Sequence, residues 1–263
     1  ESWEFEAMSF TCPISAPASV SGQGYNLAKK SDGSAQAWQL VTPYEYVITA
    51  VDADGKESEA SKGWAFTGPS SSNWAAGDYI RVAWSAVEGA EEYRVYKKEF
   101  GGRAGYIAST GALFYNDYNT RPLLSDGPPK WRDPFPDKDY PAVVCFFEQR
   151  LVFAATPKQP QTIWMSKTGD YDNFSSSVPI KGDDSLEMTI AANEVSSIRW
   201  MLPLRSLILG GAGMEWELAS SEGAFTAKSA KVTPQSYRGS AALRALVVGN
   251  ILLHVARSGR EVR

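Results

Sequence analysis

The sequence contains few of the residues on which most enzyme and metal chemistry depends. It has one histidine, His254, and two cysteines, Cys12 and Cys145, among 263 residues. A single histidine excludes multi-histidine metal sites and weakens any Ser-His-Asp proposal. Cys145 lies inside the apolar run VVCFF and far from Cys12 in sequence. We therefore favour a buried free thiol over a disulfide, and a reducing compartment during synthesis.

Basic clusters and long apolar runs are also missing from the sequence. Lys and Arg number 26 against 30 Asp and Glu, the net charge is −4, and no cluster of five basic residues occurs. The sequence therefore lacks the clustered positive charge with which proteins bind nucleic acid. A neutral or acidic wall would still suit a channel through which DNA slides. No apolar run reaches the roughly 18–20 residues that span a bilayer. We predict no membrane-spanning segment and no secretory signal.

Aromatic residues and chain breakers are plentiful. Aromatics make up 12% of the chain, with nine Trp, and there are 22 Gly and 15 Pro. This mixture favours an all-β protein, and the length suits one large or two modest domains. The chain opens on Glu1 and stops at Arg263 within an expected strand pair, so we expect a fragment of a longer protein. Residues 1–12 alternate at period two and predict a strand that pairs with chain outside this sequence.

The first half of the chain predicts loops followed by a hairpin. Residues 13–37 are rich in Ser, Gly, Ala and Pro, whereas residues 44–52 alternate clearly. Asp54-Gly55 supplies a turn, and the return strand is expected to begin at residues 57–60. Asp52 and Asp54 suggest a calcium loop, but further ligands are missing and Gly63 stands where the twelfth-position Glu belongs. A hairpin turn is the favoured interpretation.

Two stretches resemble parts of a fibronectin type III domain. VAWSAVEGAEEYRVYKK is similar to its second and third strands, with Trp84 as the core tryptophan, and YEYVITAVDADGKESEAS is similar to its last hairpin. In this sequence, the stretch that resembles the last hairpin precedes the stretch that resembles the second and third strands. Either two incomplete modules are present, or residues 13–127 form one circularly permuted sandwich. We favour the permuted sandwich because the length matches the ~100 residues that one such domain needs.

The second half predicts a linker and a repeated unit. Residues 128–141 are rich in proline and predict a stiff linker at the domain boundary. Short apolar strands then recur around Leu151, Leu207 and Ile251, and each is followed by a turn and a strand with a large side chain. The spacing approaches the ~40–50 residues of a β-propeller blade. Residues 142–263 are therefore interpreted as part of a β-propeller.

Candidate chemistry is weak throughout. His254 alternates with apolar neighbours as a strand residue would, and Gly210–Gly213 lacks the Lys-Ser/Thr of a phosphate loop, so a hairpin turn suffices. The pair Asp183-Asp184 with nearby Glu187 suggests glycosidase carboxylates, but GDDS is typical of a turn. Trp74 and Trp131 are candidate exposed aromatics that would bind sugars or a partner protein, and packing against chain outside this sequence is an equally good interpretation.

The stretch around which the chain is organised is residues 146–174, FFEQRLVFAATPKQPQTIWMSKTGDYDNF, two strands joined by a Pro-rich turn. The longer segment DYPAVVCFFEQRLVFAATPKQPQTIWMSKTGDYDNFS, residues 139–175, resembles the tail nozzle proteins of short-tailed bacteriophages, also called tail tubular protein B or phage stabilisation-type proteins. The later QSYRGSAALRALVVGNILLHVARSGREVR is also similar to that family. Met165 and Leu253-His254 depart from its pattern. The motif residues that carry the resemblance most strongly are Gln149, Arg150, Leu151, Trp164, Ser166, Gly169, Asp170 and Phe174.

The resemblance implies a structural protein and not an enzyme. A β-propeller-based protomer would assemble into a homohexameric ring at the phage tail tip, below adaptor or gatekeeper proteins and next to tail fibres or a needle. The ring would close and conduct the DNA exit channel without sequence-specific DNA binding. The resemblance implies no catalytic residue, no cofactor and no metal. It also implies a virion protein that is assembled in the host cytoplasm or encoded by a prophage.

A second hypothesis belongs to another class of protein. A carbohydrate-binding or carbohydrate-cleaving adhesin could carry the same fibronectin-like module. It would require paired carboxylates or clustered aromatics on one propeller face, and the sequence does not indicate either.

Overall fold

The computed structural model describes residues 9–27, 41–191, 196–249 and 251–263. No α-helix occurs within these ranges, and one 3-10 turn spans Ser71–Asn73, so the predicted all-β class is confirmed. Residues 1–8 of the strand predicted at residues 1–12 lie outside the described residues, and residues 9–12 are not in a strand. In chain order the strands are β1 (Ser21–Tyr25), β2 (Val41–Asp52), β3 (Trp64–Pro69), β4 (Tyr79–Ala83), β5 (Ala90–Glu99), β6 (Gly105–Thr110), β7 (Phe114–Asp117), β8 (Val143–Phe147), β9 (Arg150–Ala154), β10 (Thr162–Met165), β11 (Leu186–Thr189), β12 (Ile198–Pro203), β13 (Leu207–Gly211), β14 (Glu215–Ser220), β15 (Ala230–Ser236), β16 (Leu246–Val248) and β17 (Ile251–Leu253).

The chain divides into two compact units. The N-terminal unit comprises residues 12–131 with residues 177–179, and the C-terminal unit contains the other described residues. The division falls inside the segment expected as a linker. That segment is also partly packed within the units, since the Trp131 indole donates a hydrogen bond to the Glu57 carbonyl in one unit. In the other unit Phe135 is buried.

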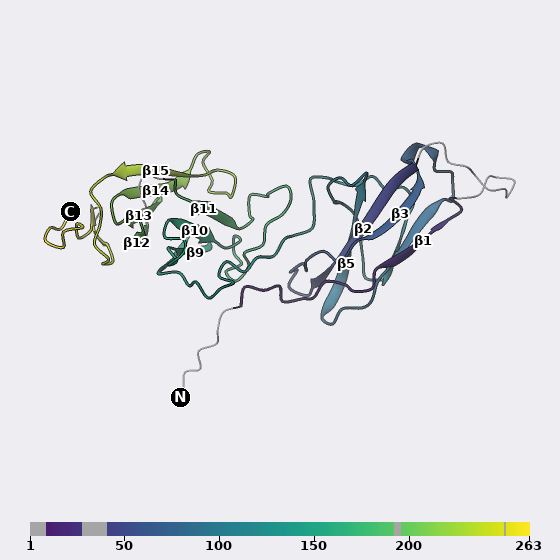
Figure 1. Cartoon of the computed structure of the whole chain (residues 1–263), viewed down its shortest axis with the longest axis horizontal. Helices are drawn as coiled ribbons and strands as arrows, with labels where there is room; N and C mark the ends of the chain where they lie inside the picture. The colour runs from purple at the N-terminus through teal and green to yellow at the C-terminus, as the bar shows by residue number, and fades with distance from the viewer. Residues whose placement is uncertain (1–8, 28–40, 192–195, 250) are drawn as a thin grey trace, which may run out of the picture. The chain divides into compact units, whose positions relative to one another are not determined.

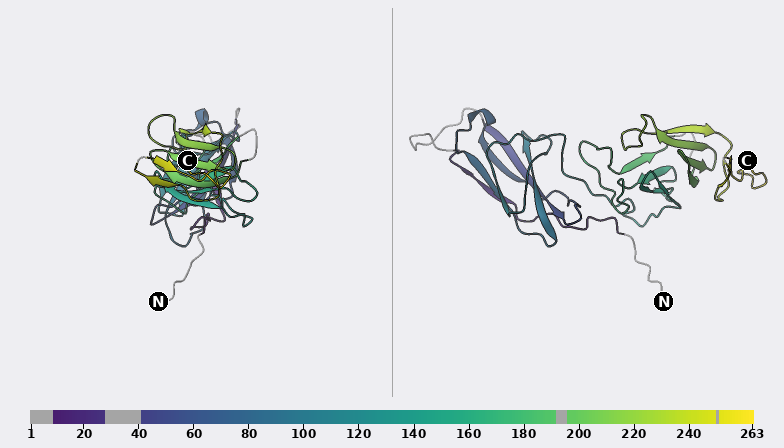
Figure 2. Two further views of the ribbon diagram at one scale, coloured as in Figure 1. Left: turned by 90° about the vertical axis from the view of Figure 1, so that its left-hand side faces the viewer. Right: turned by 180° about the vertical axis from the view of Figure 1, so that it is seen from behind.

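The N-terminal unit is built from two antiparallel sheets (Figure 1). One has the order β1-β4-β7 and the other the order β3-β2-β5-β6. Alternate residues of β2 and β5 point inward and meet those of β4, because successive side chains of a strand face opposite sides. The members of this core include Tyr46, Ile48, Ile80, Val82 and Val95. The two sheets therefore form the layers of a sandwich, which the further views in Figure 2 also show.

The predicted hairpin agrees with the structure at its turn and differs in its return strand. The turn occurs at Asp54-Gly55 as expected, with Gly55 at φ 79°. The expected return at residues 57–60 is not a regular strand, and β3 begins only at Trp64. The Ser58 and Ser61 hydroxyls accept hydrogen bonds from the backbone N–H groups of Ala50 and Ile48, so side chains replace part of the ladder. Sequence alternation cannot distinguish this arrangement from a regular strand.

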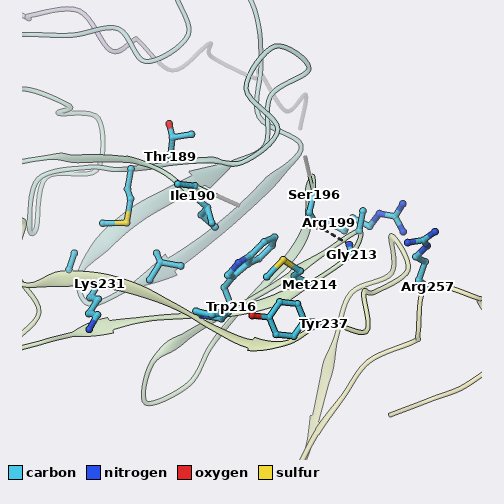
Figure 3. A pocket seen from close by; sticks show the side chains of 16 residues that line it. Thr189, Ile190, Ser196, Arg199, Gly213, Met214, Trp216, Lys231, Tyr237 and Arg257 are labelled. Carbon is cyan, nitrogen blue, oxygen red and sulfur yellow. Dashed lines mark hydrogen bonds between the residues drawn. The ribbon is translucent and has the colours of Figure 1, made fainter. Parts of the chain in front are cut away.

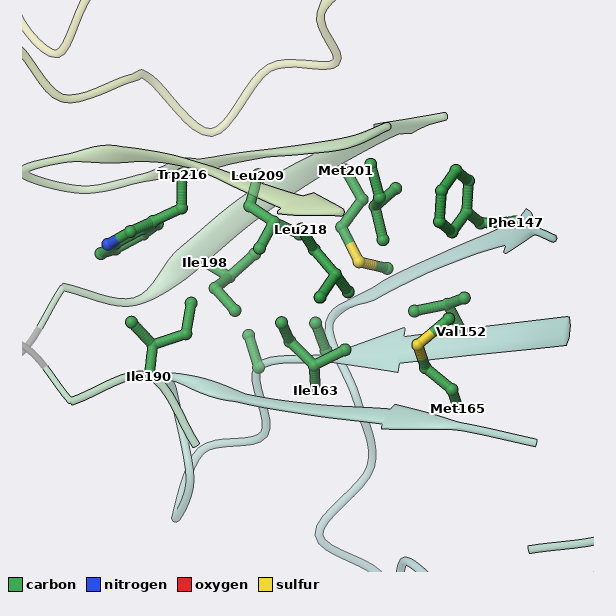
Figure 4. Close-up of a cluster of buried hydrophobic side chains, with 13 residues drawn as sticks. Phe147, Val152, Ile163, Met165, Ile190, Ile198, Met201, Leu209, Trp216 and Leu218 are labelled. Carbon is green, nitrogen blue, oxygen red and sulfur yellow. The ribbon is translucent and has the colours of Figure 1, made fainter. Parts of the chain in front are cut away.

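The C-terminal unit contains two successive four-stranded antiparallel sheets. Their orders are β11-β10-β9-β8 and β12-β13-β14-β15, so every strand pairs with its neighbour in the chain. The two sheets share one apolar core (Figure 4). Ile163 and Met165 of the first sheet contribute to the same cluster as Leu209, Trp216 and Leu218 of the second. Each sheet thus buries one face against the other.

The outer faces of these sheets are covered by separate clusters. Trp164 packs with Phe135 and Phe174 on the first sheet, and Trp200 packs with Leu202 on the second. The predicted repeats are therefore not equivalent in their tryptophans, because Trp164 faces away from the shared core and Trp216 faces into it. Neighbouring residues of a strand point to opposite faces, so a shift of one position reverses the side that is buried.

The third predicted repeat was expected to lead from the strand at Ile251 through a turn to a second strand at Val262. In the structure β17 itself pairs with the preceding β16. The residues after β17 do turn back, since Val255 forms a bridge with Val262 and the backbones of His254 and Arg263 exchange two hydrogen bonds. The short apolar run alone does not specify which neighbour completes the ladder.

Candidate functional site: a buried arginine clamp and an open cleft

The motif residues begin at a tight turn between β8 and β9. Phe147 and Arg150 face each other across this turn, and Glu148 and Gln149 both have positive φ, 47° and 56°. Two consecutive left-handed residues form the turn type that matches the twist of paired strands, although Asn and Gly adopt it more readily. The motif residue Gln149 therefore occupies a strained position in this turn.

Arg150 is fully buried and holds a loop in place. Its Nη1 atom donates to the carbonyl oxygens of Ser166 at 2.7 Å and Asp184 at 2.6 Å, and Nη2 donates to that of Gly182 at 2.9 Å. All three acceptors belong to the long connection between β10 and β11, residues 166–185. Burial lowers the pKa of Arg150, and the nearby Asp183 and Asp184 carboxylates act against that decrease. The guanidinium still stays charged, because arginine does not lose its proton in proteins.

Ser166 and Gly169 complete this arginine clamp. The Ser166 hydroxyl accepts the backbone N–H of Leu151 at 3.0 Å and donates to the Lys167 carbonyl. The Gly169 N–H donates to the Gln149 carbonyl at 2.8 Å, and Gly169 has φ 76°, a conformation that favours glycine. The motif therefore links the start of β9 to the connection that follows β10.

The remaining motif residues anchor the same connection. Asp170 accepts a hydrogen bond from the Asn173 side-chain amide at 2.9 Å, and Phe174 packs on Phe135 and Trp164. Sequence reasoning missed Asn173 and Phe135. Their only sequence signal is a polar or aromatic residue within a loop, which is too common to single them out.

The suspected carboxylate pair is not arranged for acid-base chemistry. Asp184 is buried, and its carboxylate accepts the backbone N–H of Lys181 at 2.7 Å. Glu187 lies on β11 and forms an ion pair with Arg132. Asp183 lies in the bend before β11 and is exposed. The Asp184 carboxylate thus holds a turn, and the Glu187 carboxylate takes part in an ion pair.

The glycines around residue 210 provide room for tryptophans. Gly210 and Gly211 belong to β13, and only the following residues form the expected turn. A Cβ atom at Gly210 would collide with the Trp200 ring, and one at Gly211 with the Trp216 ring. The two glycines allow indoles to approach the backbone from opposite faces of the strand.

His254 belongs to a hydrogen-bonded chain in the wrong order for a catalytic triad. It follows β17 directly, so the prediction of a strand residue was wrong by one position. Its Nδ1 atom lies 3.0 Å from the Ser240 hydroxyl, and this buried hydroxyl donates to Glu215 at 2.8 Å. A triad places the histidine between the acid and the nucleophile. Here the serine is in the middle.

The two candidate sugar-binding tryptophans are not free surface residues. Trp74 is half-buried against the sandwich core, and its Nε1 atom lies 3.2 Å from the Tyr44 hydroxyl. Trp131 is half-buried and bonded to the Glu57 carbonyl at 2.7 Å. The indoles are used in packing, so the expectation of exposed rings was wrong for both. The two cysteines are free thiols as favoured, although both are half-buried.

An open cleft of about 1110 Å³ lies at one end of the shared core (Figure 3). Met214 and Trp216 contribute apolar surface to it, and Arg199, Lys231 and Arg257 contribute positive charge. No Asp, Glu or His is among the described residues that line it. The described lining residues give the cleft an apolar wall with cations at its edge, and none of them carries a carboxylate or imidazole that could act as a general base.

The fold and these sites define an all-β chain whose motif residues form hydrogen bonds and packing contacts that hold its loops in place. In the described ranges no group of three or more His, Cys, Asp or Glu residues is placed to hold a metal ion. Those ranges also contain no helix of the length and apolarity needed to cross a membrane. No protein-family model matches the chain, and a search of curated proteins found no match.

Proposed function

We propose that this chain is part of a tail nozzle subunit of a short-tailed bacteriophage, a structural virion protein that closes and conducts the DNA exit channel. The observation that carries the proposal is the pair of consecutive four-stranded meanders that share one core. Radially repeated four-stranded sheets of this kind are the blades of β-propellers. The C-terminal unit would thus supply part of a propeller.

The strand order of the N-terminal unit supports a permuted fibronectin type III-like domain. The hairpin β2-β3 lies beside β5, which in turn lies beside β6. The last hairpin of a fibronectin-like sandwich occupies the same place next to the third strand. Because β2 and β3 precede β4 in the chain, one permuted sandwich accounts for the order without two partial modules.

The use of the motif residues supports a mechanical role. Arg150, Ser166 and Gly169 hold a loop to a strand and leave no reactive group free. A homohexameric ring also requires apolar surface between neighbouring copies. Such surface is present on the short sheet β16-β17, where Leu246, Val248 and Ile251 are 61%, 60% and 65% exposed. We assign this surface to the contact with the next copy of the protein in the ring.

Electron microscopy of the purified protein and of virus particles tests the proposal. We expect six-fold rings at high protein concentration, and labelling of the distal tail end by an antibody raised against this chain. Val248→Lys should weaken ring formation, whereas Lys228→Ala at an exposed position should not. Monomers at high concentration together with unlabelled tails would contradict the nozzle function. Binding or cleavage of glycans by the intact protein would favour the adhesin hypothesis instead.

A further inference from the structure

A lysine and an aspartate meet inside the sandwich of the N-terminal unit. Lys97 lies on β5 and Asp117 on β7, strands that belong to different sheets. The Lys97 Nζ atom is 3.0 Å from the Asp117 Oδ2 atom, and both side chains are 0% exposed. The pair therefore bridges the two layers from within the core. Burying two opposite charges carries a large desolvation cost that their attraction only partly offsets.

The groups around this pair are placed to assist condensation. The Tyr46 hydroxyl donates to Asp117 Oδ2 at 2.7 Å, and the Thr120 N–H donates to Oδ1 at 2.6 Å. The Oε1 atom of Glu99 lies 3.4 Å from the Lys97 Nζ atom. Burial, together with the Asp117 carboxylate, raises the pKa of Tyr46, so this hydroxyl retains its proton and acts as a donor.

The geometry points to an intramolecular isopeptide bond between the Lys97 side chain and the Asp117 side chain. A proton passes from the Lys97 ammonium to Oδ2 of Asp117, which leaves a neutral amine beside a carboxylic acid. The amine lone pair then attacks Cγ to form the C–N bond, and the carbonyl electrons move onto Oδ1. The Thr120 N–H stabilises the resulting oxyanion, as a backbone donor does in acyl transfer.

The second half of the reaction releases water. Glu99 accepts a proton from the attacking nitrogen, and this proton returns to the leaving oxygen. The bond between Cγ and Oδ2 breaks, one water molecule departs, and a neutral amide remains. No oxidant, reductant or further reactant is needed. No external catalyst is needed, because two groups that a closed core fixes in a reactive geometry react far faster than the same groups free in solution.

The product would join the two layers of the sandwich covalently. It would also remove both buried charges, since an amide is neutral. A cross-link between β5 and β7 would prevent the sheets from separating under force. This inference concerns the N-terminal unit alone and does not depend on the proposed function.

Mass spectrometry of the intact, denatured chain tests the bond directly. We expect a mass lower than that of the sequence by one water molecule. Trypsin should release a linked pair that joins residues 95–98 to residues 104–130, because the modified Lys97 is not cleaved and the bond between Arg121 and Pro122 resists trypsin. Asp54-Gly55 is prone to cyclisation, which also removes water, so Asp54→Ala is included and should keep the linked pair.

Two variants of the reacting pair sharpen the test. Lys97→Arg should restore the full sequence mass. Asp117→Asn should give the same linked peptides, now with loss of ammonia from the variant sequence instead of water. An unmodified mass for the folded protein, with separate peptides after digestion, would overturn the proposal and leave an ion pair only.

Discussion

Among the described residues, each of the two units buries one cation completely, and the two cations are satisfied in different ways. In the N-terminal unit Lys97 meets the carboxylate of Asp117, which comes from the opposite sheet. In the C-terminal unit Arg150 donates to three backbone carbonyls of a single connection. A compact ammonium suits one close partner, whereas the planar guanidinium presents several donors in fixed directions. The lysine therefore joins two layers, and the arginine shapes a loop.

The largest effect is expected when Lys97 loses its partner. Asp117→Ala removes the buried partner of Lys97, leaves only the partly exposed Glu99 near its Nζ atom, and should lower the free energy of unfolding by about 3–5 kcal/mol. Denaturant unfolding of the full chain measures the loss. Hydrogen exchange should increase in β2, β5 and β7 but not in β8 to β15. Asp54→Ala, at an exposed turn, is the matched control and should change stability by less than about 0.5 kcal/mol.

Removal of the arginine clamp should have a smaller effect that is confined to its loop. Arg150→Met takes the donor from three carbonyls, and each such bond to a charged group contributes about 1.5–3 kcal/mol. Because the loop can open to water, we expect a total loss of about 2–4 kcal/mol, with faster exchange in residues 166–185. Arg150→Lys should recover part of it. The exposed Arg205→Met serves as control, and equal losses in both variants would contradict the clamp.

Alanine substitutions at Gly210 and Gly213 test whether β13 contains glycine because a side chain there would collide with a tryptophan ring. Gly210→Ala forces a methyl group against the Trp200 ring and should cost about 1–3 kcal/mol. Gly213→Ala should be nearly neutral, since the closest atom to its Cβ would be the Ser196 Oγ at 3.6 Å. Thermal unfolding of both variants measures the difference. A larger loss at Gly213 would show that the turn, and not the indole, requires glycine.

The smallest effect concerns Cys145, which packs against the shared core. Burial raises its pKa from the ordinary 9.0 to about 12. The folded thiol thus keeps a proton that the unfolded chain loses. Its contribution to stability is fully present below about pH 9 and is lost as the pH rises toward 12. Cys145→Ala should show a weaker fall in stability between these pH values. Alkylation of Cys145 should also be slower in the native protein than in denaturant.

Several features followed from the sequence because they depend on local patterning. The alternation of residues 44–52 predicted β2, and Asp54-Gly55 predicted its turn. The apolar runs at Leu151 and Leu207 predicted the central hairpins of both four-stranded sheets, since burial of one face imposes a period of two. The interpretation of the motif as a phage nozzle pattern remains a proposal.

Only the tertiary structure decided which partner each side chain has. No local rule places the guanidinium of Arg150 on carbonyls up to 34 residues away, or Lys97 beside Asp117 on another sheet. Likewise, the pattern could not tell that Trp164 faces outward and Trp216 inward, because one shift in register exchanges the two faces. Periodicity along a strand determines which residues share a face of the sheet. The identity of the neighbour is settled only when distant segments pack together.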